Sequence, residues 1–285
     1  MLSNLYIFII YYFFIPISLI GYGLFFFSIN KKLRISSCLG YAGLCGIILI
    51  CIYSYISSYF YAHNQTHNFV LLMIGLINYF LFGQKIINKN QIILVSFLLI
   101  YFISILIFKT HDDFPYYHFQ YSYYLTQMPS IVGLGNFNLG MRTPSSIFYM
   151  NSIMYLPLTK YFMFHMSAFV FFLFTNMIFI SKILNDYFKK NFNFLTFYYL
   201  LSFAFVNIFF YRISEHGTDR SAQILILLFI GEILFFLNFK MNMEKILSKL
   251  FLLLGLIVSL KAFYVLYVIF FGVLLLQLLS KYNLK

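Results

Sequence analysis

The sequence predicts an all-α, polytopic membrane protein, in which about eight or nine transmembrane helices form a single domain over residues 1–285. Three observations support this fold class. Hydrophobic residues make up 62% of the chain and charged residues only 9%, whereas soluble domains carry about 25% charge. The hydrophobic residues form long runs that are almost free of charge. These runs lack the strict alternation of a membrane β-barrel, and a backbone in lipid must satisfy its own hydrogen bonds, so we expect helices.

Seven runs approach the length of about 20 apolar residues that a helix needs to cross the hydrocarbon core. They cover residues 5–28, 36–59, 68–83, 92–108, 161–180, 195–211 and 222–239. The first run lacks a basic start and a small-residue cleavage site, so we expect a retained span and not a signal peptide. Lys261 interrupts the last apolar stretch. We therefore expect a partial helix over 250–260 and a full span over 262–280.

The lysines and arginines predict the orientation of the chain, because basic residues beside spans stay in the cytoplasm. Thirteen of the 19 fall on one side of the predicted spans: Lys31, Lys32, Arg34, Lys85, Lys89, Lys182, Lys189, Lys190, Lys240, Lys245, Lys249, Lys281 and Lys285. The other side holds Lys109, Arg142, Lys160, Arg212, Arg220 and Lys261. We expect the N-terminus and the segment 109–145 outside and the C-terminus in the cytoplasm. This bias, together with the attraction of basic residues to anionic lipid headgroups, accounts for the net charge of +12. The basic residues are scattered over short loops, which does not favour nucleic-acid binding.

Titratable side chains gather on the predicted outer side. Four of the seven acids lie there, and so do most of the histidines: Asp112, Asp113, Glu215 and Asp219, with His63, His67, His111, His118 and His216. His165 is expected near the outer start of the fifth run. Groups that can perform chemistry therefore share one face. The alternative explanation is that longer outer loops collect polar residues of every kind.

One long segment, from Lys109 to Pro157, breaks the apolar pattern. It contains four of the five prolines and the glycines Gly133, Gly135 and Gly140. Loops longer than about 12–15 residues are usually functional or disordered, and the many aromatic residues argue against disorder. We expect an ordered outer loop over 109–145 with short interfacial helices. One of these would cover 145–156, with Phe148, Tyr149 and Met154 facing lipid.

Asp112 and Asp113 follow the fourth run closely, so we expect them near the outer membrane surface. Neighbouring carboxylates repel each other, which raises the pKa of one of them and suits it to act as a base. The pair could equally hold a divalent cation. His111 and His118 flank the pair and are expected to tune it or to bind substrate. The alternatives are a solvated loop or a helix cap, since Asp113 shortly precedes Pro115.

Other charged residues are expected to complete a substrate site. The segment 212–223 carries four of them, which either join the long loop or pair with one another: Glu215, His216, Asp219 and Arg220. Arg142 is a fixed positive charge suited to phosphate. Lys261 either faces the outer cavity and binds a lipid phosphate or extends to the membrane interface.

The remaining polar residues of the runs are expected to be structural. Cys38, Cys45 and Cys51 lie in the second run without the spacing of a metal or redox site, so they should pack as small hydrophobes. Glu232 lies in the seventh run and is expected to pack against a polar neighbour. No Walker loop, dinucleotide fingerprint or H-E-x-x-H motif occurs. No internal repeat supports an inverted-repeat transporter.

An acidic pair just outside a span, followed by an ordered loop with interfacial helices, resembles the GT-C superfamily of membrane glycosyltransferases. The string HDDFPYYHF…GLGNFN…RTPSSIFY also resembles a group of bacterial membrane proteins allied to them. This resemblance covers residues 109–157, with weaker support from 212–223. It implies a loop that faces a lipid-phosphate sugar donor, with the catalytic role on Asp112 or Asp113. The acidic loop here follows the fourth span and not the first, and the chain is short for such an enzyme, as a truncated gene product would be.

These observations predict a glycosyltransferase that moves a sugar from a polyprenyl-phosphate carrier to a cell-envelope acceptor, on the outer face of the bacterial inner membrane. Asp112 or Asp113 would deprotonate or orient the acceptor hydroxyl, and Arg142, Arg220 or Lys261 would stabilise the departing phosphate. The reaction requires no cofactor, and a divalent metal ion on the acidic pair is left open. The alternative functions are a transporter or flippase for a lipid-linked substrate and an assembly subunit.

Overall fold

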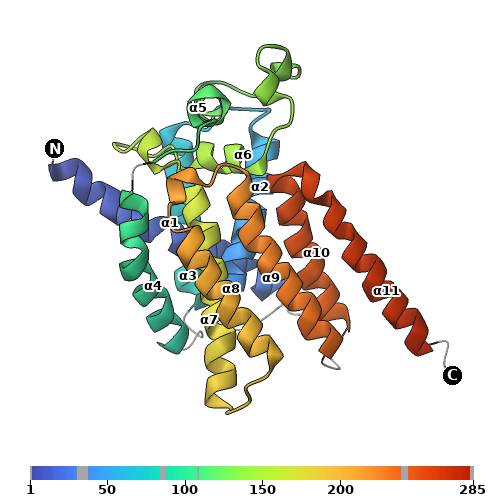
Figure 1. Cartoon of the computed structure of the whole chain (residues 1–285). Helices are drawn as coiled ribbons and strands as arrows, with labels where there is room; N and C mark the ends of the chain where they lie inside the picture. Colours follow the sequence, from blue (N-terminus) through green and yellow to red (C-terminus); the bar gives the residue numbers. More distant parts are fainter. Residues whose placement is uncertain (1, 31–37, 84–87, 108, 239–242, 283–285) are drawn as a thin grey trace.

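The computed structural model describes residues 2–30, 38–83, 88–107, 109–238 and 243–282. Over these residues the chain is all-α and contains no β-strand. The helices lie side by side in one bundle, and the long loop covers one end of it (Figure 1). The coarse fold class expected from the sequence is therefore confirmed.

Four helices form the N-terminal part of the bundle: α1 (Leu2–Ile29), α2 (Leu39–Ser57), α3 (Gln65–Gly83) and α4 (Asn88–Leu106). The first three pack closely because small residues let their backbones approach. A Cβ atom added at Gly46 of α2 would lie 1.8 Å from the carbonyl oxygen of Leu19 in α1. One added at Gly21 of α1 would lie 1.9 Å from the carbonyl oxygen of Gly75 in α3. Any side chain at Gly46 or Gly21 would therefore force these helices apart.

The C-terminal part contains five further helices: α7 (Met166–Phe188), α8 (Phe194–Phe209), α9 (Asp219–Asn238), α10 (Met243–Leu260) and α11 (Ile269–Tyr282). The N-terminal half of α7 is central to the packing, since every residue from Met166 to Phe179 is buried. α8 begins with a capping box, in which Asn193 and Thr196 bond each other's backbone amides. The helix is interrupted at Lys261 as expected, and a 3₁₀ segment, η7 (Ala262–Val268), leads into α11.

The long loop folds into short helical elements: the π-helical turn η2 (Phe114–His118), α5 (Phe119–Gln127), the 3₁₀ turns η3 (Leu134–Asn136) and η4 (Leu139–Met141), and α6 (Ser146–Ile153). The prediction that Phe148, Tyr149 and Met154 face lipid is wrong, because all three are buried. α6 packs against α2 and α5. Asn68 of α3 holds the end of α6 in place by donating to the carbonyl oxygens of Ser152 (2.7 Å) and Tyr155 (3.0 Å).

Five helical segments are long and apolar enough to cross a membrane: Leu5–Ile29, Leu39–Ser57, Gln65–Gly83, Tyr161–Phe188 and Asp219–Leu237. Four shorter apolar helices, of 10–17 residues, cover Asn90–Leu106, Phe194–Phe209, Leu247–Leu260 and Ala262–Leu274. By length and composition, the described part of the chain therefore contains five candidate spans, fewer than the eight or nine expected.

The connections between helices sort to two ends of the bundle. The long loop, the α8–α9 connection and the end of α10 lie at one end, and the α7–α8 turn lies at the other (Figure 1). The charge pattern predicts the same division. The side chains of nine predicted cytoplasmic cations lie outside the described residues: Lys31, Lys32, Arg34, Lys85, Lys89, Lys240, Lys245, Lys281 and Lys285.

A cluster of charges is buried inside the bundle, between α7, α9 and α10. Glu232 is 1% exposed and forms ion pairs with Lys182 and with Lys249, the latter at 2.7 Å. Tyr41 of α2 donates a hydrogen bond of 2.6 Å to the same carboxylate. Glu232 thus packs against polar neighbours, as expected. Lys182 and Lys249 are not loop cations, because they lie within helices with side chains only 19% and 12% exposed.

Candidate polar centre at the loop end of the bundle

The acidic pair lies where the long loop enters η2. The backbone carbonyl of Asp113 accepts hydrogen bonds from the amides of Tyr117 (3.2 Å) and His118 (3.5 Å). Pro115 suits the first turn because its missing N–H would have no helical partner there. Asp113 occupies the N-cap position, but its side chain makes no capping bond. The helix-cap alternative therefore applies to its backbone only, and the carboxylate makes other contacts.

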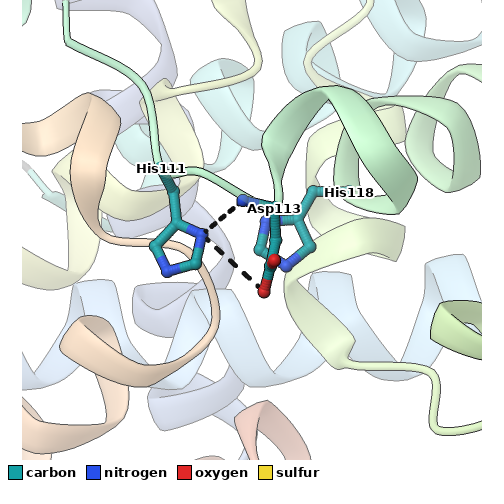
Figure 2. Close-up of side chains that lie close together, drawn as sticks. All are labelled: His111, Asp113 and His118. Carbon is teal, nitrogen blue, oxygen red and sulfur yellow. Dashed lines mark hydrogen bonds and ion pairs between the residues drawn. The ribbon is translucent and has the colours of Figure 1, made fainter.

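Three side chains meet at the Asp113 carboxylate, and Figure 2 shows His111, Asp113 and His118 together. Nδ1 of His111 lies 4.0 Å from Oδ2 of Asp113. The Tyr117 hydroxyl donates to the same oxygen at 3.2 Å. One donor atom from each of His111, Asp113 and His118 lies within 4.8 Å of the others. We call these three residues with Tyr117 the polar centre.

The two histidines of the polar centre differ in burial. His118 is 3% exposed, and its Nε2 has no hydrogen-bond partner among the described residues. Burial lowers the pKa of His118 to about 4, so its imidazole is neutral at neutral pH. The charges of Lys261 and Asp219 also act on this pKa, with smaller effects than burial. His111 is partly exposed, and its Nδ1 accepts a hydrogen bond of 3.1 Å from the amide of Asp113.

The two neighbouring acids have different surroundings. Asp112 is exposed and forms no ion pair with any described residue. Asp113 has a side chain 48% exposed and contacts Tyr117 and His111. Only Asp113 therefore belongs to the polar centre.

The segment 212–223 is joined to the long loop. The amide of His111 donates to the carbonyl oxygen of Ser214 at 3.0 Å. Gly217 has a positive φ of 54°, and a Cβ atom there would lie 3.0 Å from the His111 ring. Glycine is needed at this position both for its backbone conformation and for the room it leaves.

Glu215 pairs with basic residues of both segments. Its carboxylate lies 2.7 Å from Arg220, 3.3 Å from Arg212 and 3.2 Å from Lys109 of the long loop. Hydrogen bonds from Arg220, Lys109 and Arg212 outweigh the effect of burial and lower the pKa of Glu215 to about 2. Glu215 thus pairs with the arginines of its own segment and also with Lys109 of the long loop, and its part in a substrate site stays a prediction.

Lys261 and Asp219 form an ion pair beside the polar centre. The ammonium nitrogen of Lys261 lies 3.0 Å from the carboxylate of Asp219, and both side chains are partly exposed. Asp219 also raises the pKa of Tyr117, although burial and Asp113 have larger effects. This ion pair joins the start of α9 to the end of α10, and the charge of Asp219 acts on Tyr117 of η2.

Two predicted substrate-binding residues lie elsewhere. His216 is fully buried, and its Nε2 is 2.7 Å from the carbonyl oxygen of Phe210. Burial lowers the pKa of His216 to about 4, which keeps it neutral. Arg142 is exposed, and its Nε donates to the carbonyl oxygen of Gly135 at 3.4 Å. Arg142 therefore joins η3 to η4 and is not part of the polar centre.

Sequence reasoning missed Tyr117 and Lys109. Tyr117 follows Asp113 by four residues, a spacing that places side chains on one face of a helical turn. Together with the helix-cap alternative at Asp113, that spacing could have identified Tyr117. The sequence pattern marks Lys109 only as an orientation signal, because its partner Glu215 is too distant in sequence for any local pattern to reveal.

An apolar groove lies beneath α6, between α2 and α10. It has a volume of about 790 Å³ and is lined by Ile48, Cys51, Ile52, Tyr55, Phe251 and Gly255 among others. At its edge the hydroxyl groups of Ser146 and Ser259 are 3.0 Å apart. Ser259 precedes Lys261 by two residues, so the groove ends close to the Lys261–Asp219 pair.

The fold and the polar centre define a helical membrane protein with a structured loop at one end of its bundle. The chain belongs to the family described as a domain of unknown function (DUF8201), whose model matches residues 4–285. No curated protein matches the chain, and no solved structure does.

Proposed function

We propose that the chain is a glycosyltransferase of the GT-C type, which transfers a sugar from a polyprenyl-phosphate donor to a cell-envelope acceptor on the outer face of the bacterial inner membrane. The observation that carries this proposal is the meeting of an acid, two histidines and a cation at the loop end of a membrane bundle. In this reaction the acceptor oxygen forms a bond to the anomeric carbon of the sugar. The bond from that carbon to phosphate breaks, and polyprenyl phosphate leaves with both bonding electrons.

Asp113 is the base in this proposal. Its carboxylate is half-exposed, so an acceptor hydroxyl can reach it, while Tyr117 holds one of its oxygens in place. The acceptor proton passes to this carboxylate as the new bond forms. Asp112 lacks such contacts and serves only to keep the surface acidic. His111 and His118 lie beside Asp113 and line the place where the acceptor hydroxyl would approach.

Lys261 and Arg220 neutralise the departing phosphate. Lys261 is close enough to the polar centre for its charge to act on His118, and its side chain is 41% exposed. Positive charges that already lie where negative charge develops stabilise a transition state without further rearrangement. Asp219 and Glu215 hold these two cations in the unliganded protein.

The groove between α2 and α10 receives the lipid chain of the donor. Its volume of about 790 Å³ is within the range of about 300–1,000 Å³ for small-molecule sites. Its lining is mostly apolar, and its polar edge at Ser146 and Ser259 lies towards Lys261. A chain in the groove would therefore place the phosphate near the cations.

We further propose that the four shorter apolar helices also cross the membrane, which gives nine crossings with the N-terminus outside. One of these four helices is α8, which has 16 residues. At about 1.5 Å per residue it is about 24 Å long, which a locally thinned bilayer accommodates at modest cost.

The test is to replace Asp113 with Asn and to compare envelope glycans by mass spectrometry. A strain that lacks the chain is complemented with the wild-type, Asp113→Asn or Asp112→Asn form. We expect Asp113→Asn to lose the glycan signal by about two orders of magnitude or more, as removal of a general base does. Asp112→Asn removes the same charge one residue away and is expected to retain the signal.

Insertion must be equal in all three strains, measured by the amount of folded chain in the membrane fraction. Unchanged glycans in the Asp113→Asn strain, with normal insertion, would reject the catalytic assignment. Unchanged glycans in the strain that lacks the chain would reject the glycosyltransferase proposal as a whole.

A further inference from the structure

The polar centre has the composition of a metal site. We propose that His111, Asp113 and His118 bind a divalent transition-metal ion, with Zn²⁺ the preferred ion. Two imidazole nitrogens and one carboxylate are a donor set that catalytic zinc sites use. Mg²⁺ and Ca²⁺ prefer oxygen ligands, and the three residues supply only one carboxylate.

The distances suit a small ion after a local adjustment. The three donor atoms lie within 4.8 Å of one another, whereas donors around a tetrahedral zinc ion are about 3.3 Å apart. His111 can supply most of the movement, because it precedes η2 in a non-helical segment and its side chain is 31% exposed. Binding through Nδ1 requires that one hydrogen bond, from the amide of Asp113, be given up.

A second, independent observation points to a ligand at this place. Nε2 of His118 is buried without a hydrogen-bond partner among the described residues. A buried polar atom in this state is destabilising unless a water molecule or an ion meets it. A cavity of about 20 Å³ is lined by His111 and His118, but not by Asp113, and most of its other lining residues are apolar. This volume is enough for about one water-sized species.

The surroundings also resemble those of bound metals. The carboxylate of a metal ligand is usually oriented by a hydrogen bond from a neighbouring group, and Tyr117 donates such a bond to Asp113. Three protein ligands would leave one position of a tetrahedral ion open to water or substrate. A part for the ion in sugar transfer rests on the proposed function, whereas ion binding itself does not.

The test uses the full chain, purified without a histidine tag, stripped with EDTA and kept in detergent. Titration with Zn²⁺ alone, followed by calorimetry, is expected to show one equivalent bound by the wild type. His118→Gln and Asp113→Asn are each expected to weaken binding by about tenfold or more, since even indirect support of a metal costs about 10–100-fold when lost. Asp112→Asn is the matched control and is expected to bind as the wild type does. Titration with Co²⁺ should give the visible absorption of a tetrahedral ion in the wild type and in Asp112→Asn, but not in His118→Gln or Asp113→Asn.

Two results would overturn the proposal. The first is a wild-type chain that binds no Zn²⁺ at micromolar concentrations. The second is equal binding by the wild type, His118→Gln and Asp113→Asn, which would assign the ion to other side chains. The melting temperature of each variant in EDTA reports whether it is folded. Zn²⁺ should raise the melting temperature of the wild type but not that of folded His118→Gln. Failure of the glycan test with intact Zn²⁺ binding would reject the proposed function alone, and the reverse pattern would reject the metal site alone.

Discussion

At the scale of single residues, Glu215 connects the two polar segments at the loop end of the bundle. Its side chain is 10% exposed and meets Arg220, Arg212 and Lys109. A nearly buried carboxylate that loses its charge leaves these basic groups without a partner. Hydrogen bonds to charged groups contribute about 1.5–3 kcal/mol each, more than those between neutral groups. Glu215 is therefore expected to stabilise the folded chain only while it is ionised.

Glu215→Gln is expected to lower the unfolding temperature at pH 7 by about 2–4 °C, the change that corresponds to about 1 kcal/mol in a chain of this size. The pKa of Glu215 is about 2 in the folded chain and 4.5 ordinarily. A lowered pKa stabilises the folded state fully above about pH 4.5, and this contribution is lost as the pH falls towards 2. The difference between wild type and Glu215→Gln should therefore shrink between pH 5 and pH 3, measured by thermal unfolding in detergent.

Asp112→Asn is the control for that experiment, because Asp112 is an exposed acid without an ion pair in the described structure. We expect the unfolding temperature of Asp112→Asn to equal that of the wild type at pH 5 and at pH 3. A Glu215→Gln difference that stays constant down to pH 3 would contradict the assigned pKa.

The choice between Asp112 and Asp113 shows what a local pattern leaves undecided. Both acids have the same neighbours in sequence, and the spacing of the string offers no preference. The turn η2 directs only Asp113 towards Tyr117 and His111, and Tyr117 and His118 bond the backbone of Asp113. The local sequence therefore identified the region of the polar centre, and the backbone conformation selected the residue.

At the scale of elements, α6 and α10 determine the shape of the groove. Ser145 at the start of α6 donates to the carbonyl oxygen of Leu260 at 2.6 Å, and this bond fixes the loop over the end of α10. Gly255 of α10 lines the groove, and a Cβ atom added there would meet nothing within 4 Å. The groove can therefore be filled by mutation without a clash in the backbone.

Gly255→Trp is expected to fill the groove and to reduce long-chain lipid bound to the purified protein by about tenfold, which corresponds to about 1.4 kcal/mol. The measurement is mass spectrometry of the lipids that co-purify, together with envelope glycans. Gly272→Trp is the matched control, since Gly272 of α11 also has nothing within 4 Å and lies outside the groove lining. Equal lipid content in the two variants would show that the groove holds no lipid chain.

The burial of α6 could not be predicted from its composition. Apolar side chains face a lipid bilayer or a protein interior equally well, so Phe148 and Met154 are compatible with either place. The position of α6 depends on Asn68 and Ser145, which bond distant backbone groups. Such contacts join segments more than 80 residues apart, beyond the reach of any periodic pattern.

At the scale of the whole molecule, the bundle has two chemically different ends. One end holds the polar centre, the Glu215 cluster and the Lys261–Asp219 pair. The α7–α8 turn at the other end carries Lys189 and Lys190. Between α7, α9 and α10, Glu232 is paired with two lysines, and removal of one partner of such a buried set is strongly destabilising.

The orientation can be tested with a thiol reagent that does not cross membranes. Val132 in the long loop is 94% exposed, and Lys189 lies in the α7–α8 turn. We expect Val132→Cys to react in right-side-out vesicles and Lys189→Cys only in inside-out vesicles. The wild-type chain supplies the background, which should be low because Cys38, Cys45 and Cys51 are buried. Reaction of both variants from one side would contradict the proposed topology.

The sequence by itself determined the class of this protein and the region where its polar chemistry gathers. Apolar runs predict membrane helices because lipid leaves a backbone no other way to satisfy its hydrogen bonds, and prolines, glycines and acids mark the loop between them. The tertiary structure decided which polar groups meet. Asp113 with His118, Lys109 with Glu215, Lys261 with Asp219 and Glu232 with its two lysines come together only when helices distant in the chain pack against one another. Those pairings depend on packing and on the direction of each side chain, and local composition and spacing contain neither.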